Sequence, residues 1–154
     1  MNSENKVKLF VVDDDPMYLK IVEIEFFQYP GFQLETYATG EECLENLSNM
    51  PDLIILDYYL NSIDKHAMNG IETLDKIKKN NPGIPVVMLS SQDNIEVAIN
   101  CMHHKAYDYI VKSETAFIRL QKVIATITHI QKLETALEWY MEKMQADLTK
   151  QSER

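Results

Sequence analysis

The chain has 154 residues, of which 45% are hydrophobic and 25% are charged. It is therefore long enough for one domain with a buried core, and its composition is not that of a disordered protein. No apolar stretch approaches the roughly 20 residues needed to span a bilayer, and the polar segment 1–8 lacks the apolar part of a secretory signal. Two cysteines, Cys43 and Cys101, are too few for a disulfide framework. We expect a cytoplasmic protein with no membrane partner.

The net charge of −9 comes from the first part of the chain. Residues 1–112 contain 9 Lys and Arg against 18 Asp and Glu, whereas residues 113–154 contain 6 of each. Nucleic-acid binding needs clustered cations that neutralise phosphates. Direct contact with nucleic acid is therefore not expected.

Hydrophobic segments alternate with helical patterns five times. Continuous apolar runs of four to six residues are typical of strands that are buried on both faces of a parallel sheet. The pattern predicts an α/β fold, a doubly wound (βα)5 parallel sheet with helices on both faces. In chain order we expect strand 9–12, helix 17–28 after Asp15-Pro16 with Ile21, Ile24 and Phe27 at helical spacing, strand 32–38, a short helix holding Cys43, Leu44 and Leu47, strand 53–56, helix 70–80, strand 85–89, helix 94–103 and strand 107–111.

The final segment, from Ser113 to about Lys150, contains neither glycine nor proline and has helical periodicity throughout. A helix of about 37 residues would be about 55 Å long, which exceeds the length of the sheet. Its last 15–20 residues or so should project away from the sheet and expose an apolar seam that needs a partner. The stripe expected to pack on the sheet is Phe117, Leu120, Ile124 and Ile127, and the seam beyond it is Ile130, Leu133, Leu137, Tyr140 and Met144, with Asp147 next in register.

Polar residues follow the predicted strands directly. Asp13 and Asp14 follow the first strand, Asp57 the third, Ser90 the fourth and Lys112 the fifth. The ends of parallel strands converge on one rim of an open α/β sheet, where ligands bind. Each residue alone could be a turn, a helix cap or a solvated strand end. Their joint occurrence, in this order, favours one site.

Three carboxylates at close quarters would raise one another's pKa unless a cation lay among them, and Mg²⁺ prefers carboxylate and water oxygens. Asp57 could then attack a phosphoryl donor and form an acyl phosphate. The Lys112 ammonium, the Ser90 hydroxyl and the magnesium ion would each stabilise the negative charge on one of the three phosphoryl oxygens.

These residues resemble the receiver domain of two-component response regulators, over roughly residues 7–130. The resemblance implies a flavodoxin-like fold in which Asp57 accepts phosphate from a histidine kinase or a histidine phosphotransfer protein. It also implies that Ser90 and Tyr109 are paired switch residues, and that a downstream protein binds the face formed by the fourth helix, fifth strand and fifth helix. The magnesium ligands would be Asp13, Asp14, Asp57 and the Tyr59 carbonyl. The matching motifs are Val-Val-Asp-Asp-Asp-Pro at 11–16, Asp-Leu-Ile-Ile-Leu-Asp at 52–57, Met-Asn-Gly at 68–70, Pro-Val-Val-Met-Leu-Ser-Ser at 85–91 and Tyr-Asp-Tyr-Ile-Val-Lys at 107–112.

The chain departs from the family pattern in three places. The loop from Asp57 to Gly70 is several residues longer, and its segment 62–66 either gates the site or is a passive insertion. Ser113 replaces the usual proline after Lys112, which predicts a trans bond with a shifted loop or a strained cis bond, since a cis bond before a non-proline residue costs about 3–4 kcal/mol. Ser113 is also a reasonable N-cap for the last helix. That helix overruns the family's usual end by some twenty residues.

We therefore expect a receiver domain at 1–130 and a helical extension at 131–154, which is a linker or a coiled-coil segment. The extension either forms a homodimer as a short coiled coil, which we favour, or docks on a partner helix, or is a fraying tail. The extension is too short for a DNA-binding or catalytic output domain. The chain would not be an enzyme but a phosphoacceptor that assists its own phosphorylation and dephosphorylation. The alternative is a phosphorylation-independent interaction module. An aspartate-nucleophile phosphohydrolase is disfavoured, because Asp57-Tyr58-Tyr59 lacks the Asp-x-Asp pattern.

Overall fold

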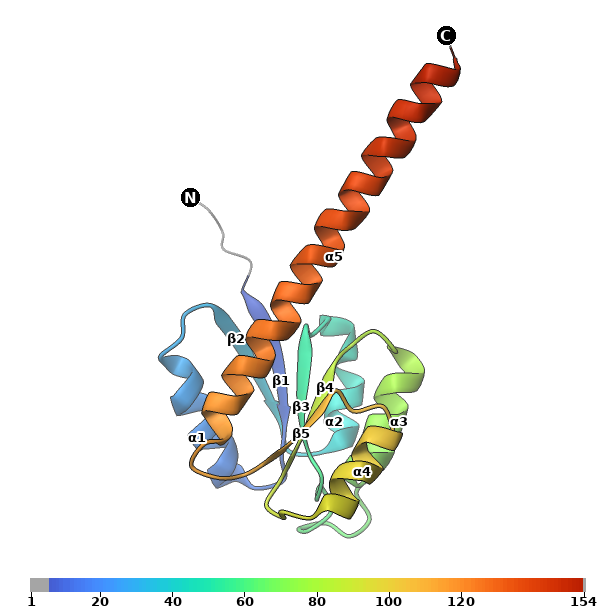
Figure 1. Cartoon of the computed structure of the whole chain (residues 1–154). Helices are drawn as coiled ribbons and strands as arrows, with labels where there is room; N and C mark the ends of the chain where they lie inside the picture. The colour runs from blue at the N-terminus through green and yellow to red at the C-terminus, as the bar shows by residue number, and fades with distance from the viewer. Residues whose placement is uncertain (1–5, 154) are drawn as a thin grey trace. The chain divides into compact units, whose positions relative to one another are not determined.

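A computed structural model describes residues 6–153 (Figure 1). Residues 1–5 and 154 lie outside the described part, and with them most of the polar segment 1–8 and the last residue of the predicted extension. The chain divides into two units, one ending at Leu120 and one beginning at Gln121. We refer to them as the receiver unit and the helical unit; the boundary lies within helix α5 (Ala116–Ser152).

The receiver unit contains a five-stranded, wholly parallel sheet in the order β2-β1-β3-β4-β5. The chain order reverses direction between the neighbours β1 and β3, which is the topological switch point where open α/β sheets bind ligands. The predicted (βα)5 architecture is confirmed. The strands are β1 (Val7–Val12), β2 (Phe32–Tyr37), β3 (Leu53–Asp57), β4 (Val86–Ser90) and β5 (Asp108–Val111).

The central strands are buried on both faces, as their continuous apolar runs predicted. Every residue of β3 and of β4 is buried. Because strand side chains alternate in direction, Ile54 and Leu56 join one core together with Leu74 of α3 and Cys101 of α4. In Figure 1, α2, α3 and α4 lie on one side of the strands and α1 on the other.

The helices start at polar caps that the sequence supplies locally. The Asp15 carboxylate accepts a hydrogen bond from the amide of Met17, and Pro16 occupies the first turn of α1. Asn69 and Glu72 form a reciprocal capping box at the start of α3. The helices of the receiver unit are α1 (Pro16–Phe27), α2 (Gly40–Glu45), the 3-10 helix η1 (Leu47–Asn49), α3 (Gly70–Asn80), α4 (Ile95–His103) and the beginning of α5.

The interpretation of Ser113 as the cap of the last helix was wrong. Helix α5 begins three residues later, where the Thr115 carbonyl accepts a hydrogen bond from the amide of Arg119. The Ser113 hydroxyl lies 3.2 Å from the Thr115 hydroxyl and its carbonyl accepts from the amide of Ala116, so residues 113–115 form a turn instead.

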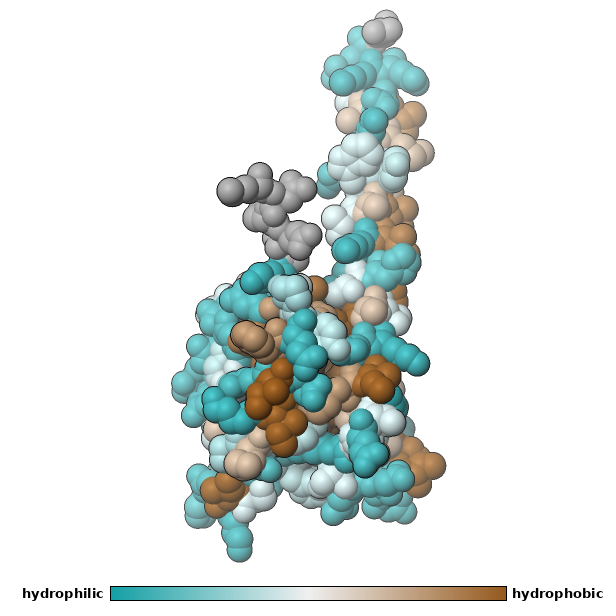
Figure 2. Space-filling view, turned by 90° about the vertical axis from the view of Figure 1, so that its left-hand side faces the viewer, coloured by the Kyte–Doolittle hydropathy of each residue, from teal (hydrophilic) through white to brown (hydrophobic). Residues whose placement is uncertain are grey.

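Helix α1 is apolar almost all round, and its spacing did not reveal its buried face. Val22 and Phe26 are buried, whereas the apolar residues at 21, 24 and 27 are exposed, Phe27 by 89%. Figure 2, which views the molecule from the side of α1, shows hydrophobic side chains grouped among hydrophilic ones. Helix α1 therefore exposes several apolar side chains to solvent.

The helical unit is the uninterrupted continuation of α5 to Ser152, and every residue from 132 to 153 is exposed. Within the predicted inner stripe, Leu120, Ile124 and Ile127 are buried. The outer seam is open to solvent, with Leu137 60% and Met144 65% exposed. Among residues 6–153, no helix combines the length and the apolar composition that crossing a bilayer would require.

Candidate phosphoacceptor site

The strand registers bring the predicted polar residues to one rim. Val12 of β1 pairs with Leu56 of β3, so that Asp13 and Asp57 follow at the same level. Leu89 pairs with Asp57, and Ser90 pairs with Val111 immediately before Lys112. The rim is thus a direct consequence of the parallel pairing of buried strands.

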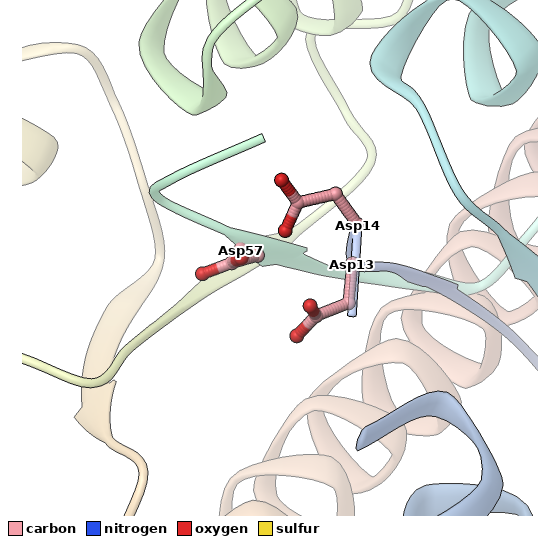
Figure 3. A group of neighbouring side chains, drawn as sticks. All are labelled: Asp13, Asp14 and Asp57. Atoms are coloured by element: carbon pink, nitrogen blue, oxygen red, sulfur yellow. The ribbon is translucent and has the colours of Figure 1, made fainter. Parts of the chain in front are cut away.

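Asp13, Asp14 and Asp57 form a compact cluster of carboxylates. Each offers one oxygen, and these oxygens all lie within 4.8 Å of one another. Figure 3 shows the three carboxyl groups extending to the same side of the strand ends, two from the segment after β1 and one from β3. Asp13 is 1% and Asp57 5% exposed. Within residues 6–153, this is the only group of three such side chains close enough to hold a metal ion.

Burial makes this cluster unfavourable when it is fully ionised. Burial raises the pKa of Asp57 to about 7, and the charge of Asp13 adds to the rise; Lys112 and the amide of Tyr59 act in the opposite direction. Burial also raises the pKa of Asp13, against the stabilising hydrogen bond from Lys112. A divalent cation would supply the missing positive charge, and carboxylate oxygens are the ligands that Mg²⁺ prefers. The donor set therefore fits magnesium.

Lys112 reaches the cluster although serine follows it. Its ammonium lies 2.6 Å from Asp13 Oδ2 and 3.5 Å from Asp57 Oδ1. No cis peptide bond occurs in residues 6–153, so the Lys112–Ser113 bond is trans, and the strained cis alternative was wrong; the shifted loop stays a prediction. The Lys112 amide donates to the Ser90 carbonyl at 2.7 Å, which continues the β4–β5 pairing and fixes the backbone from which the side chain extends.

Ser90 and Tyr109 are linked through one intermediate residue. The fully buried Ser90 hydroxyl accepts a hydrogen bond from the Gln92 amide at 3.2 Å, and the Tyr109 hydroxyl donates to the Gln92 carbonyl. Burial raises the pKa of Tyr109, so its hydroxyl stays protonated and acts as a donor. The segment after β4 thus connects the two residues predicted to act as a pair.

The long loop between β3 and α3 is fastened directly to the carboxylate cluster. Asp14 Oδ2 accepts hydrogen bonds from the Ser62 amide at 3.0 Å, from the Ser62 hydroxyl and from the Ile63 amide at 3.4 Å. At its far end the Met68 amide donates to Glu41 Oε1 at 2.7 Å. The sequence left open whether segment 62–66 gates the site or is a passive insertion, and it did not reveal the hydrogen bonds to Asp14.

Sequence reasoning missed Tyr18, which lies in the first turn of α1. The Lys112 ammonium is 4.3 Å from the centre of its ring. An aromatic residue five positions after Asp13 is the only local signal, and nothing in the sequence pairs it with a lysine from β5. Neither His103 nor His104 belongs to the carboxylate cluster, and His104 Nδ1 lies 2.7 Å from Asp75 Oδ1.

Comparison with known proteins identifies the family. Residues 9–127 match the response regulator receiver domain. The probable transcriptional regulatory protein TcrX of Mycobacterium tuberculosis is 29% identical over 122 residues, which cover 77% of this chain and 50% of TcrX. The nitrogen assimilation regulatory protein NtrX of Azorhizobium caulinodans is 33% identical over 105 residues, 68% of this chain and 22% of NtrX.

Among solved structures, the signal receiver domain of a putative LuxO repressor protein from Vibrio parahaemolyticus superposes with a TM-score of 0.72 at 25% identity, and the alignment covers 86% of this chain and 98% of that domain. The chain belongs to the receiver domain family of two-component response regulators. It spans half or less of the length of these curated relatives.

Proposed function

We propose that the chain accepts a phosphoryl group on Asp57 from a histidine kinase or a histidine phosphotransfer protein. The observation that carries this proposal is the surroundings of Asp57, a buried carboxylate that shares one cluster with Asp13 and Asp14 and lies 3.5 Å from the Lys112 ammonium. An anionic nucleophile, a metal-binding carboxylate pair and a fixed cation are the components that phosphoryl transfer requires.

Asp13, Asp14 and Asp57 would hold magnesium, with the Tyr59 carbonyl as a further ligand. The backbone of Tyr59 is already at the cluster, because its amide donates to Asp57 Oδ1 at 3.4 Å. When bound, magnesium would neutralise the carboxylates and one phosphoryl oxygen. It would also lower the pKa of Asp57 from about 7, so that the nucleophile is ionised.

In the transfer, a carboxylate oxygen of Asp57 forms a bond to phosphorus while the bond from phosphorus to the donor's imidazole nitrogen breaks. The imidazole leaves with that electron pair, and an acyl phosphate remains on Asp57. Lys112 would leave Asp13 to pair with one phosphoryl oxygen, and the Ser90 hydroxyl would bind another. Water later attacks phosphorus, the bond from phosphorus to the Asp57 oxygen breaks, and inorganic phosphate leaves while the carboxylate is restored. The chain would thus assist its own phosphorylation and dephosphorylation.

Phosphorylation would be transmitted through Ser90 and Tyr109. If the Ser90 hydroxyl turns to the phosphoryl group, it gives up its hydrogen bond with the Gln92 amide, and the contact of Tyr109 with the Gln92 carbonyl changes with it. The two arrangements would differ in how they bind a downstream protein at the face of α4, β5 and the beginning of α5.

The helical unit would form a homodimer through its seam of Ile130, Leu133, Leu137, Tyr140 and Met144. Figure 2 shows hydrophobic side chains recurring along this helix. The equal numbers of basic and acidic residues in 113–154 avoid the repulsion that the acidic body would create. Analytical ultracentrifugation should show a dimer for the full chain and a monomer for Leu137→Glu. A monomeric wild-type chain at high concentration would exclude this part of the proposal.

The chain would act in the cytoplasm and would not contact nucleic acid itself. The acidic excess of residues 1–112 opposes binding to phosphates. The relatives TcrX and NtrX are regulatory proteins of which this chain matches only a part, so their other activities are not transferred to it.

The proposal is tested by intact mass after incubation with acetyl phosphate, with and without magnesium. We expect one added phosphoryl group that requires magnesium and is absent from Asp57→Asn. Ser113→Ala serves as a matched surface control and should be phosphorylated like the wild type. No adduct, even in a quenched-flow experiment that captures short-lived species, would favour the phosphorylation-independent interaction module.

A further inference from the structure

Lys112 is held by an aromatic side chain as well as by carboxylates. Its ammonium lies 2.6 Å from Asp13 Oδ2 on one side and 4.3 Å from the centre of the Tyr18 ring on another. The Lys112 side chain is only 16% exposed, so little water competes for the ammonium. A cation over an aromatic face is attracted by the ring quadrupole, and the attraction is strongest where the cation is desolvated.

The ring of Tyr18 is itself fixed from behind. It stacks on Phe117, with ring centres 6.4 Å apart and an angle of 18° between the planes. Tyr18 belongs to the first turn of α1 and Phe117 to the first turn of α5, so the two helix starts bring both rings beside the end of β5. The turn at residues 113–115, which connects Lys112 to α5, leads directly into this stack.

The hydroxyl of Tyr18 shows that the ring, rather than its polar end, makes the interaction. The hydroxyl oxygen is buried and has no hydrogen-bond partner among the described residues. An unpaired buried hydroxyl is unfavourable. Burial, with the negative charges of Asp13 and Asp57, raises the pKa of Tyr18 to about 12, so the ring stays neutral beside the lysine.

We propose that Tyr18 is a positioning residue for Lys112: its ring, backed by Phe117, keeps the ammonium within reach of the Asp57 carboxylate. The lysine can then exchange Asp13 for a phosphoryl oxygen by a short movement across the same aromatic face. The proposal rests on the proposed phosphorylation of Asp57 for its functional consequence, but not for the contact itself.

The test combines Tyr18→Leu, Tyr18→Phe and a Lys112→Gln background. With acetyl phosphate and saturating magnesium, Tyr18→Leu should lower the phosphorylation rate about fivefold to twentyfold, the factor expected for a desolvated cation–π contact. Tyr18→Phe retains the ring and should stay within about twofold of the wild type. In the Lys112→Gln background, Tyr18→Leu should change the residual rate less than about twofold, because coupled residues are not additive.

A second measurement reads the contact without any phosphorylation. In the NMR spectrum of the unphosphorylated protein, the Lys112 methylene protons next to the ammonium should be shifted upfield by the ring, in the wild type and in Tyr18→Phe but not in Tyr18→Leu. An equal loss of rate from Tyr18→Leu in both backgrounds, or unshifted Lys112 protons in the wild type, would overturn the proposal. If no variant or wild-type protein is phosphorylated while the shift is present, the proposed function fails and the contact stands.

Discussion

The receiver unit and the helical unit use the same apolar residue types for opposite purposes. In the receiver unit, every residue of β3 and β4 is buried, and the leucines and isoleucines there hold the sheet between its helices. In the helical unit, each residue from 132 to 153 is exposed, including Leu133 and Leu137. An isolated helix gains little stability from its own side chains. Apolar residues thus form a core in the first unit and an exposed seam in the second, and it is for this seam that we propose association.

Truncating one leucine in each unit should give the largest difference in the free energy of unfolding. Leu74→Ala removes a fully buried side chain from the core and should lower the free energy of unfolding by about 2–5 kcal/mol. Leu137→Ala removes a side chain that is 60% exposed and should change the monomer by less than about 0.5 kcal/mol. Urea unfolding, at concentrations where the protein is monomeric, measures both. Similar losses would show that the helical unit has a core of its own.

The second difference is the dependence of folding stability on pH, which should come from the receiver unit alone. Burial raises the pKa of Asp57 to about 7 in the folded protein, above its ordinary value of 3.8. The protonated form therefore favours folding: its contribution is complete below about pH 4 and is lost as the pH rises through about 7. Since a shift of one pKa unit corresponds to about 1.4 kcal/mol, the free energy of unfolding of the magnesium-free protein should fall by on the order of 2–4 kcal/mol over this pH range.

Chemical unfolding between about pH 4 and pH 8, in the presence of a chelator, measures this loss. Asp57→Asn cannot ionise and should flatten much of the dependence, and magnesium should restore the stability of the wild type at high pH. A stability profile that is the same for the wild type and Asp57→Asn would contradict the assignment of the raised pKa to this carboxyl group.

A smaller effect on stability should distinguish two glycines of the receiver unit when each is replaced by alanine. A methyl group added to Gly70 would lie 2.4 Å from the backbone oxygen of Asp57 and 2.7 Å from that of Tyr58, whereas one added to Gly83 would meet nothing within 4 Å. Gly70→Ala should cost about 1–3 kcal/mol and slow phosphorylation by displacing the backbone of Asp57. Gly83→Ala is the matched control and should be neutral or slightly stabilising. Thermal unfolding of the two variants, side by side, compares them.

The smallest expected effect concerns the loop between β3 and α3. Ser62→Ala removes the hydroxyl that donates to Asp14 Oδ2 but keeps the amide that donates to the same oxygen. Because Asp14 then has one competing donor fewer, we expect magnesium to bind about twofold to fivefold more tightly, as for the loss of one weak hydrogen bond. Calorimetric titration with magnesium measures the affinity. Unchanged affinity would indicate that segment 62–66 is a passive insertion.

The features that were predictable from sequence are those that depend on burial along a strand. Apolar runs such as 53–56 can be satisfied only in a sheet covered on both faces, so the strands, their parallel order and the rim with Asp57 followed from the sequence. The start of the first helix at Asp15-Pro16 was similarly visible, because the capping group is next to the helix that it caps, whereas the capping box of Asn69 was not predicted.

What the sequence did not reveal depends on side chains that meet across the fold. The contact of Tyr18 with Lys112 joins the first helix to the fifth strand, and the binding of Ser62 to Asp14 joins two loops. The apolar residues of α1 are spread almost all round the helix, so periodicity could not select Val22 and Phe26 as its buried face. Such contacts are fixed by packing, which a one-dimensional pattern does not record.

The two cysteines have a practical consequence. Cys43 and Cys101 are both free and buried, and burial raises the pKa of their thiols to about 12 and about 11. Since only the thiolate reacts with maleimides, both cysteines should be unreactive near neutral pH. A third cysteine placed in the exposed loop after β3, or in the seam of α5, would then be the single reactive position. A fluorophore or spin label attached there would report on either unit without any need to alter the native sequence elsewhere.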